Sequence, residues 1–136
     1  MKTSKLSGII FVLVALLSIK ELALAENHWS DEWEVEVDGK STSSGIINFK
    51  ITFEPGVDVA AREAVTVDVQ VANDTGENDV ADIISNSFRA VLGDEEFEVD
   101  VKSGEKVEIE SKGETPNFVL EITASSIQGI SLELDH

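Results

Sequence analysis

The architecture of the chain follows from residues 65–101, which read VTVDVQVANDTGENDVADIISNSFRAVLGDEEFEVDV. Apolar and polar residues alternate over 65–71 and 97–101, as in strands that have one face in water. Between these segments the apolar spacing changes to every third or fourth residue, which indicates an amphipathic helix. The stretch therefore predicts a strand, a helix over about 79–92 and a second strand. The helix is expected to bury one face against a sheet through Val80, Ile83, Ile84, Phe88, Val91 and Leu92.

The ends of this helix carry boundary signals. Asn78 or Asp79 is expected to cap the first turn, because their side-chain oxygens can accept a hydrogen bond from a free backbone amide. Gly93 stands where a glycine in the left-handed conformation commonly ends a helix.

Further segments alternate in the same way and bring the expected number of strands to about seven. The segments 33–38 and 47–53 are expected to pair as a hairpin through residues 39–45. Residues 102–106 should close a second hairpin, between 97–101 and 107–109. The predicted fold class is α+β, either a mostly antiparallel sheet with one packed helix or a β-sandwich with one embedded helix. If the strands beside the helix were parallel and in one sheet, the helix would form a right-handed crossover. The further segments are 33–38, 47–53, 107–109, 118–122 and 130–134.

Several short motifs accompany the helix within residues 65–120. They are Asp74-Thr75, VADI at 80–83, FEV at 97–99, GEKVEI at 104–109 and GETPNF at 113–118. In this order they resemble the strand–helix–strand–hairpin module of phage tail-sheath-type proteins and of flagellin and hook-associated proteins. The resemblance implies assembly or surface display, and it carries no functional residue to this chain.

Residues 1–25 have the composition of a secretory signal peptide. Two lysines precede an apolar run over 9–17, and Ala23-Leu24-Ala25 offers small residues at a cleavage site. Residues 26–31 then form a polar lead-in, and 32–136 are expected to be a single small β-rich domain. The chain is therefore predicted to be secreted or periplasmic. No membrane insertion is expected after cleavage, because no second apolar run is long enough to span a bilayer.

The composition is strongly acidic. The chain has 27 Asp and Glu against 10 Lys and Arg, and only three of those basic residues and one of the acids fall within residues 1–25. This balance excludes a nucleic-acid partner, since phosphates would be repelled over most of the surface. The absence of cysteine excludes thiolate metal sites and thiol catalysis. A protein or cation partner is expected, and the oligomeric state is left open.

The acidic residues of the predicted strands alternate with apolar ones. The pattern is typical of a solvated sheet face, and a surface dedicated to a basic ligand is the alternative interpretation. The residues concerned are Glu34, Glu36, Asp38, Glu98, Asp100, Glu108 and Glu110.

The two histidines, His28 and His136, lie near the ends of the chain. A nucleophilic hydrolase needs a histidine held rigidly beside its partners, and neither position predicts this. No catalytic residue is assigned. We expect an exported, acidic, non-catalytic interaction or structural domain. A divalent-cation-binding exported protein is the alternative, and a small hydrolase is the second alternative.

Two segments could hold a metal ion. Cleavage after Ala25 would leave Glu26-Asn27-His28 at the start of the chain, where an amine, two amides and an imidazole can form the square plane of nitrogens that Cu(II) and Ni(II) favour. A second, oxygen-rich segment could bind Ca²⁺, and its acids would equally favour the positive end of the helix. Its ligands would be Asn73, Asp74, Glu77 and Asp79. No other cofactor is expected.

Overall fold

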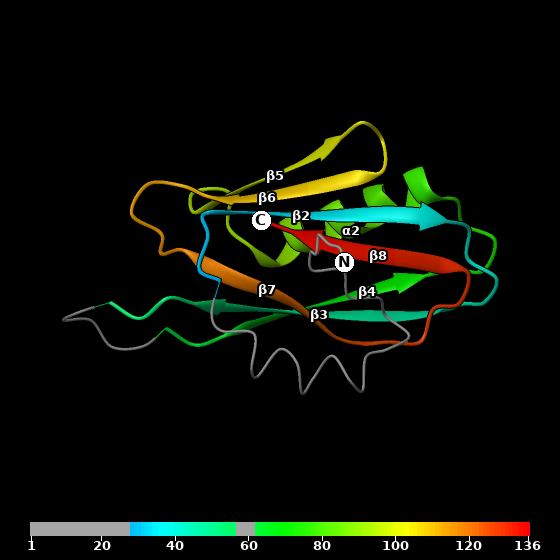
Figure 1. Cartoon of the computed structure of the whole chain (residues 1–136), viewed down its shortest axis with the longest axis horizontal. Helices are drawn as coiled ribbons and strands as arrows, with labels where there is room; N and C mark the ends of the chain where they lie inside the picture. Colours follow the sequence, from blue (N-terminus) through cyan, green and yellow to red (C-terminus); the bar gives the residue numbers. More distant parts are fainter. Residues whose placement is uncertain (1–27, 57–61) are drawn as a thin grey trace.

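The fold is a two-layer α+β sandwich, described for residues 28–56 and 62–136 in a computed structural model (Figure 1). Within these residues seven strands form two antiparallel sheets, and one helix packs against them. The α+β prediction is confirmed. In chain order the elements are β2 (Glu32–Gly39), β3 (Gly45–Phe53), β4 (Val65–Val71), α2 (Glu77–Val91), β5 (Phe97–Lys102), β6 (Lys106–Ser111), β7 (Phe118–Ser125) and β8 (Ile130–Asp135).

The strand order is β5-β6-β2-β8 in the four-stranded sheet and β4-β3-β7 in the three-stranded sheet. β2 pairs with both β6 and β8, so both of its edges are occupied and β3 pairs elsewhere. The expected hairpin between the first two strands is therefore wrong, and residues 39–45 connect the two sheets instead. Alternation identifies a strand and its buried face, but it does not identify the partner strand.

The second expected hairpin is confirmed. β5 and β6 pair in register from Phe97 opposite Ser111 to Lys102 opposite Lys106. Ser103 and Gly104 turn the chain with positive φ angles of 55° and 83°. Gly104 makes this conformation accessible, because a residue without a Cβ atom adopts it at little cost.

α2 connects β4 to β5, which belong to different sheets. The helix therefore links the two layers and does not form a crossover within one sheet. It contacts β4 in the three-stranded sheet and β2, β5 and β6 in the four-stranded sheet. In Figure 1 the helix lies behind β2 of the four-stranded sheet. The inner face of the four-stranded sheet is thus covered partly by the helix and partly by the three-stranded sheet.

The helix buries Val80, Ile84 and Phe88 completely, and the Phe88 ring meets the ring of Phe49 at 5.0 Å between centroids. The expected burial of Val91 is wrong, because this last helical residue is 50% exposed. Because α2 has neighbours in both sheets, its buried face is wider than the expected apolar stripe. The residues Ala81 and Ser85 are buried as well, Leu92 is buried just beyond the helix, and Ile83 is only partly buried.

The helix ends differ from the expected caps. The N-cap residue is Gly76, which makes no side-chain capping bond, and neither Asn78 nor Asp79 holds this position. Acidic side chains in the first turn supply the favourable interaction with the helix dipole. At the other end the Leu92 amide donates to the Phe88 carbonyl oxygen, and Gly93 does not adopt a positive φ. Leu92 leaves the helix in an extended conformation, so no left-handed residue is required.

The two layers are tied together at the start of β2. The Trp33 indole N–H donates to the Phe118 carbonyl oxygen at 2.8 Å, and Trp33 is only 6% exposed. The Ser30 amide donates to the same oxygen at 3.1 Å, while the Phe118 amide donates to the Ser30 carbonyl oxygen at 2.8 Å. Residues from 30 to 33 are therefore fixed against β7.

Candidate functional site

The outer face of the four-stranded sheet is the most highly charged surface that the strand registers define. Alternation turns the apolar residues of β2, β5, β6 and β8 toward the core and the acidic ones outward. We call this surface the acidic face. It carries ten carboxylates and two lysines, which are Glu32, Glu34, Glu36, Asp38, Glu98, Asp100, Glu108, Glu110, Glu133, Asp135, Lys102 and Lys106.

The strand registers align these carboxylates in rows across the sheet. Glu110 stands opposite both Glu98 and Glu32. The next row runs from Asp100 through Glu108 and Glu34 to Asp135. Directly opposed like charges destabilise a sheet by about 0.2–1 kcal/mol per pair, so this arrangement costs stability.

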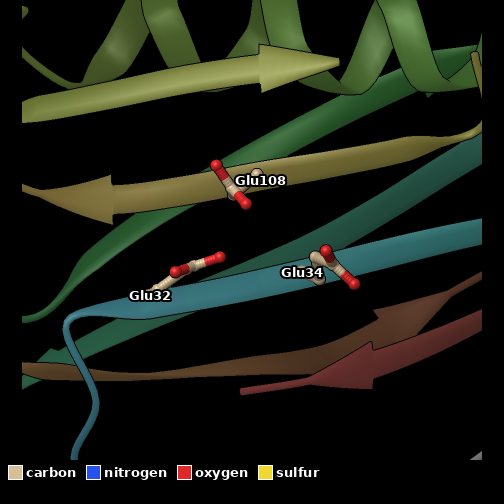
Figure 2. Close-up of side chains that lie close together, drawn as sticks. All are labelled: Glu32, Glu34 and Glu108. Carbon is tan, nitrogen blue, oxygen red and sulfur yellow. The ribbon is translucent and has the colours of Figure 1, made fainter. Parts of the chain in front are cut away.

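Three of the carboxylates converge. Figure 2 shows Glu108 on β6 facing Glu32 and Glu34 on β2, and one oxygen from each side chain lies within 4.8 Å of the other two. A side-chain hydrogen bond with Glu108 and partial burial raise the pKa of Glu32 to about 7. The negative charges of neighbouring glutamates act in the same direction. The Glu32 carboxyl is therefore protonated in part of the molecules near neutral pH.

A second carboxyl pair on the acidic face behaves similarly. A side-chain hydrogen bond with Asp100, together with the charge of Asp100, raises the pKa of Glu98. The crowding of carboxylates is thus present at the β5 edge of the sheet as well as at its centre.

The outer face of the three-stranded sheet is different. Lys50 stands opposite Glu121, and Asp68 accepts a hydrogen bond of 2.6 Å from the Asn48 side-chain amide. The other outward residues of β3 and β4 are uncharged, including Thr52, Thr66 and Gln70. The negative charge is therefore concentrated on one of the two sheet faces.

Two of the four side chains expected to bind Ca²⁺ are engaged with other parts of the protein. Asp74 pairs with Lys40 at 3.0 Å, and Glu77 accepts a hydrogen bond from the Gly39 amide at 3.0 Å. The backbone amide of Asn73 donates to the Ser44 hydroxyl, and Asp79 is exposed in the first turn of α2. Within the described residues, the acids of this loop do not converge as Glu32, Glu34 and Glu108 do.

The expected terminal copper motif is described only in part, because Glu26 and Asn27 lie outside the described residues. His28 is described, and its ring stacks on that of His136 at 5.1 Å between centroids. The His136 ring also lies 4.7 Å from the Trp33 ring. Burial, and then the charge of His28, lower the pKa of His136, while Asp135 acts in the opposite direction.

The contact between the two histidines was not predicted from the sequence, because it depends on which strands pair. β8 runs antiparallel to β2 with Asp135 opposite Glu34, so His136, which follows Asp135, comes to lie against Trp33, which precedes Glu34. The convergence of Glu32, Glu34 and Glu108 was missed for the same reason, since it depends on the pairing of β2 with β6.

No protein-family model, curated protein or solved structure matches the chain. Among the described residues, no helix combines the length and the apolar character that crossing a membrane requires.

Proposed function

We propose that the chain is an exported, non-catalytic interaction domain whose acidic face binds a positively charged partner. The observation that carries the proposal is the unequal charge of the two sheets. An acidic surface that served only solubility would need no such concentration, and it would gain stability by placing lysines opposite the glutamates. The rows of like charge forgo that stability, and a cationic partner would recover it by neutralising them.

The geometry favours an extended basic segment as the partner. Neighbouring strands lie about 4.7–4.9 Å apart, and outward residues of one strand repeat every 6.4–6.8 Å or so. Alternate side chains of an extended peptide repeat at the same interval. Lysines or arginines at every second position can therefore meet successive carboxylates such as Glu32, Glu34 and Glu36.

Export rests on the signal-peptide features of residues 1–25, and the resemblance of residues 65–120 to surface modules agrees with display outside the cell. Intact-mass measurement of the protein recovered from outside the cytoplasm tests this part. The expected result is the loss of residues 1–25, and a retained segment would contradict export through a cleaved signal.

The test uses a peptide that carries lysine at alternate positions. Calorimetry measures the affinity of the protein for this peptide at low and at physiological salt concentration. The row variant combines Glu34→Gln, Asp100→Asn and Glu108→Gln. We expect this variant to bind the peptide about tenfold or more weakly. Removing even part of one row of carboxylates should cost about 1.4 kcal/mol of binding free energy, which is a tenfold change in affinity. Circular dichroism checks that the variant is folded.

The matched control removes the same number of charges away from the acidic face, through Asp82→Asn, Asp94→Asn and Glu95→Gln. These residues are exposed on α2 and on the turn that follows it. We expect the control to change the affinity by less than about threefold. Equal losses in both variants would show a response to net charge and overturn the proposal. If the protein bound Ca²⁺ but not the peptide, the proposal of a basic partner would be wrong and the alternative, a cation-binding protein, would be favoured.

A further inference from the structure

The two histidines of the sequence meet in the fold although they stand far apart in the chain. Their placement depends on one backbone position, Phe118. Its carbonyl oxygen accepts hydrogen bonds from the Ser30 amide and from the Trp33 indole. The first bond anchors the segment that carries His28, and the second fixes the ring on which His136 rests.

We propose that His28 and His136 form a binding site for a divalent transition-metal ion that prefers imidazole ligands, with Cu(II) bound most tightly. Imidazole nitrogens suit copper, nickel and zinc, and the order of affinity among divalent ions peaks at copper. This site is separate from the carboxylate group of Glu32, Glu34 and Glu108. It shares His28 with the terminal motif but needs neither a free amine nor residues 26 and 27.

The spacing of the two rings fits a shared ion. Metal–nitrogen bonds of about 2.0–2.1 Å place the centroids of two bound imidazoles about 4.5 Å apart at a right angle and about 5.2 Å apart at a tetrahedral angle. The observed separation of 5.1 Å lies within this interval. The rings are stacked with 29° between their planes, so binding requires rotation about the Cβ–Cγ bonds. That torsion is broad in histidine, so the rotation is inexpensive.

Both imidazoles can be reached by an ion from solvent, because His28 and His136 are exposed. A metal binds the neutral form of an imidazole, so binding should weaken as the pH falls. Asp135 lies next to His136, and its carboxylate accepts a hydrogen bond from the His136 amide. Water fills the other coordination positions of a metal held by two protein ligands.

The test is a Cu(II) titration of the full chain, in which Glu26 is not a terminus and the terminal motif cannot form. Glycine in the buffer suppresses weak binding to carboxylates. We expect one ion per chain and quenching of tryptophan fluorescence, since Trp33 touches His136. His28→Ala and His136→Ala should each weaken binding by about tenfold or more, because loss of even an outer partner of a metal ligand costs about 10–100-fold.

The control is Glu133→Gln, which removes a carboxylate from the same strand as the site and leaves both imidazoles in place. It should change the affinity by less than about twofold. Both histidine residues are exposed, so their variants should fold normally, and thermal unfolding without metal checks this. An unchanged affinity in either histidine variant, an equal loss in the control, or no binding by the full chain would overturn the proposal.

Discussion

Replacing Glu32 by Gln should stabilise the protein at pH 8 and have almost no effect at pH 5. Glu32 faces Glu110 across the strand pair and forms a side-chain hydrogen bond with Glu108, and the pKa of Glu32 in the folded protein is raised from 4.5 to about 7. The folded state therefore holds this proton more tightly than the unfolded state does. The stability that protonation lends is complete below about pH 4.5 and is lost as the pH rises through 7.

The magnitude follows from the exposure of the side chain. Glu32 is partly accessible to solvent, so water screens the repulsion, and the full pKa shift overstates the energy. Opposed like charges cost about 0.2–1 kcal/mol per pair, and Glu32→Gln relieves the contacts with Glu108 and Glu110 together. We expect a gain of about 1 kcal/mol at pH 8, or about 4 °C in the midpoint of thermal unfolding. At pH 5 the carboxyl is already protonated and Gln is its neutral counterpart.

The assay is thermal and urea unfolding at pH 5 and pH 8, with Glu36→Gln as the matched control. Glu36 lies on the same strand and face but between Lys106 on β6 and Glu133 on β8, so the attraction and the repulsion that it loses offset each other, and its removal should change stability by no more than a few tenths of a kcal/mol at both pH values. The lowered pKa of His136 makes stability fall as the pH falls, which is opposite to the effect of Glu32. This contribution is the same in the unaltered protein and in both variants, so it cancels in the comparison. At 1 M NaCl, where the screening length falls to about 3 Å, the gain should shrink. Destabilisation by Glu32→Gln at pH 8 would refute the reasoning.

Two further predictions concern packing. Phe88→Ala removes the contact with Phe49 in the core and should lower the free energy of unfolding by about 3–5 kcal/mol, measured by urea unfolding. Val91→Ala, on the exposed side of the same helix, should lower it by less than about 0.5 kcal/mol in the same assay. Equal effects would show that the helix does not pack as described. Gly129→Ala should lower the thermal midpoint through a loss of at least about 2 kcal/mol, because Gly129 has a φ of 89° and a Cβ there would clash with the Lys40 carbonyl oxygen and approach the Thr42 amide nitrogen to 2.9 Å. Gly113→Ala, also at a positive φ but with open space around it, should cost less.

Much of the fold could be predicted from local patterns. The strand over 65–71 has the expected bounds, and the helix was placed within two residues at its start and one at its end. These elements are readable because burial of one face imposes a period of two or of 3.6 on the sequence. The helix caps were not readable, since Gly76 makes no side-chain capping bond and Leu92 ends the helix without a left-handed residue.

Strand pairing was only partly readable, and the candidate sites depended on it. The short loop 102–106 forces β5 and β6 together, whereas nothing near β2 in the sequence identifies β6 and β8 as its partners. The contact between His28 and His136 and the convergence of Glu108 with Glu32 both arise from those two distant pairings. Composition could predict an acidic surface, but only the register shows that like charges stand opposite one another.

The residues buried beneath the acidic face must stabilise the sheet enough to offset the repulsion between its carboxylates. Directly beneath its rows lie Val35, Val107 and Ile109, which are completely buried. Each such side chain contributes about 1.5–3 kcal/mol on burial, while an opposed pair of carboxylates costs at most about 1 kcal/mol. The core can therefore hold the carboxylates in fixed rows in the absence of a partner. When a partner binds carboxylates that are already fixed in place, little conformational entropy is lost. Binding to a disordered acidic tail would lose more, because the tail would have to become ordered.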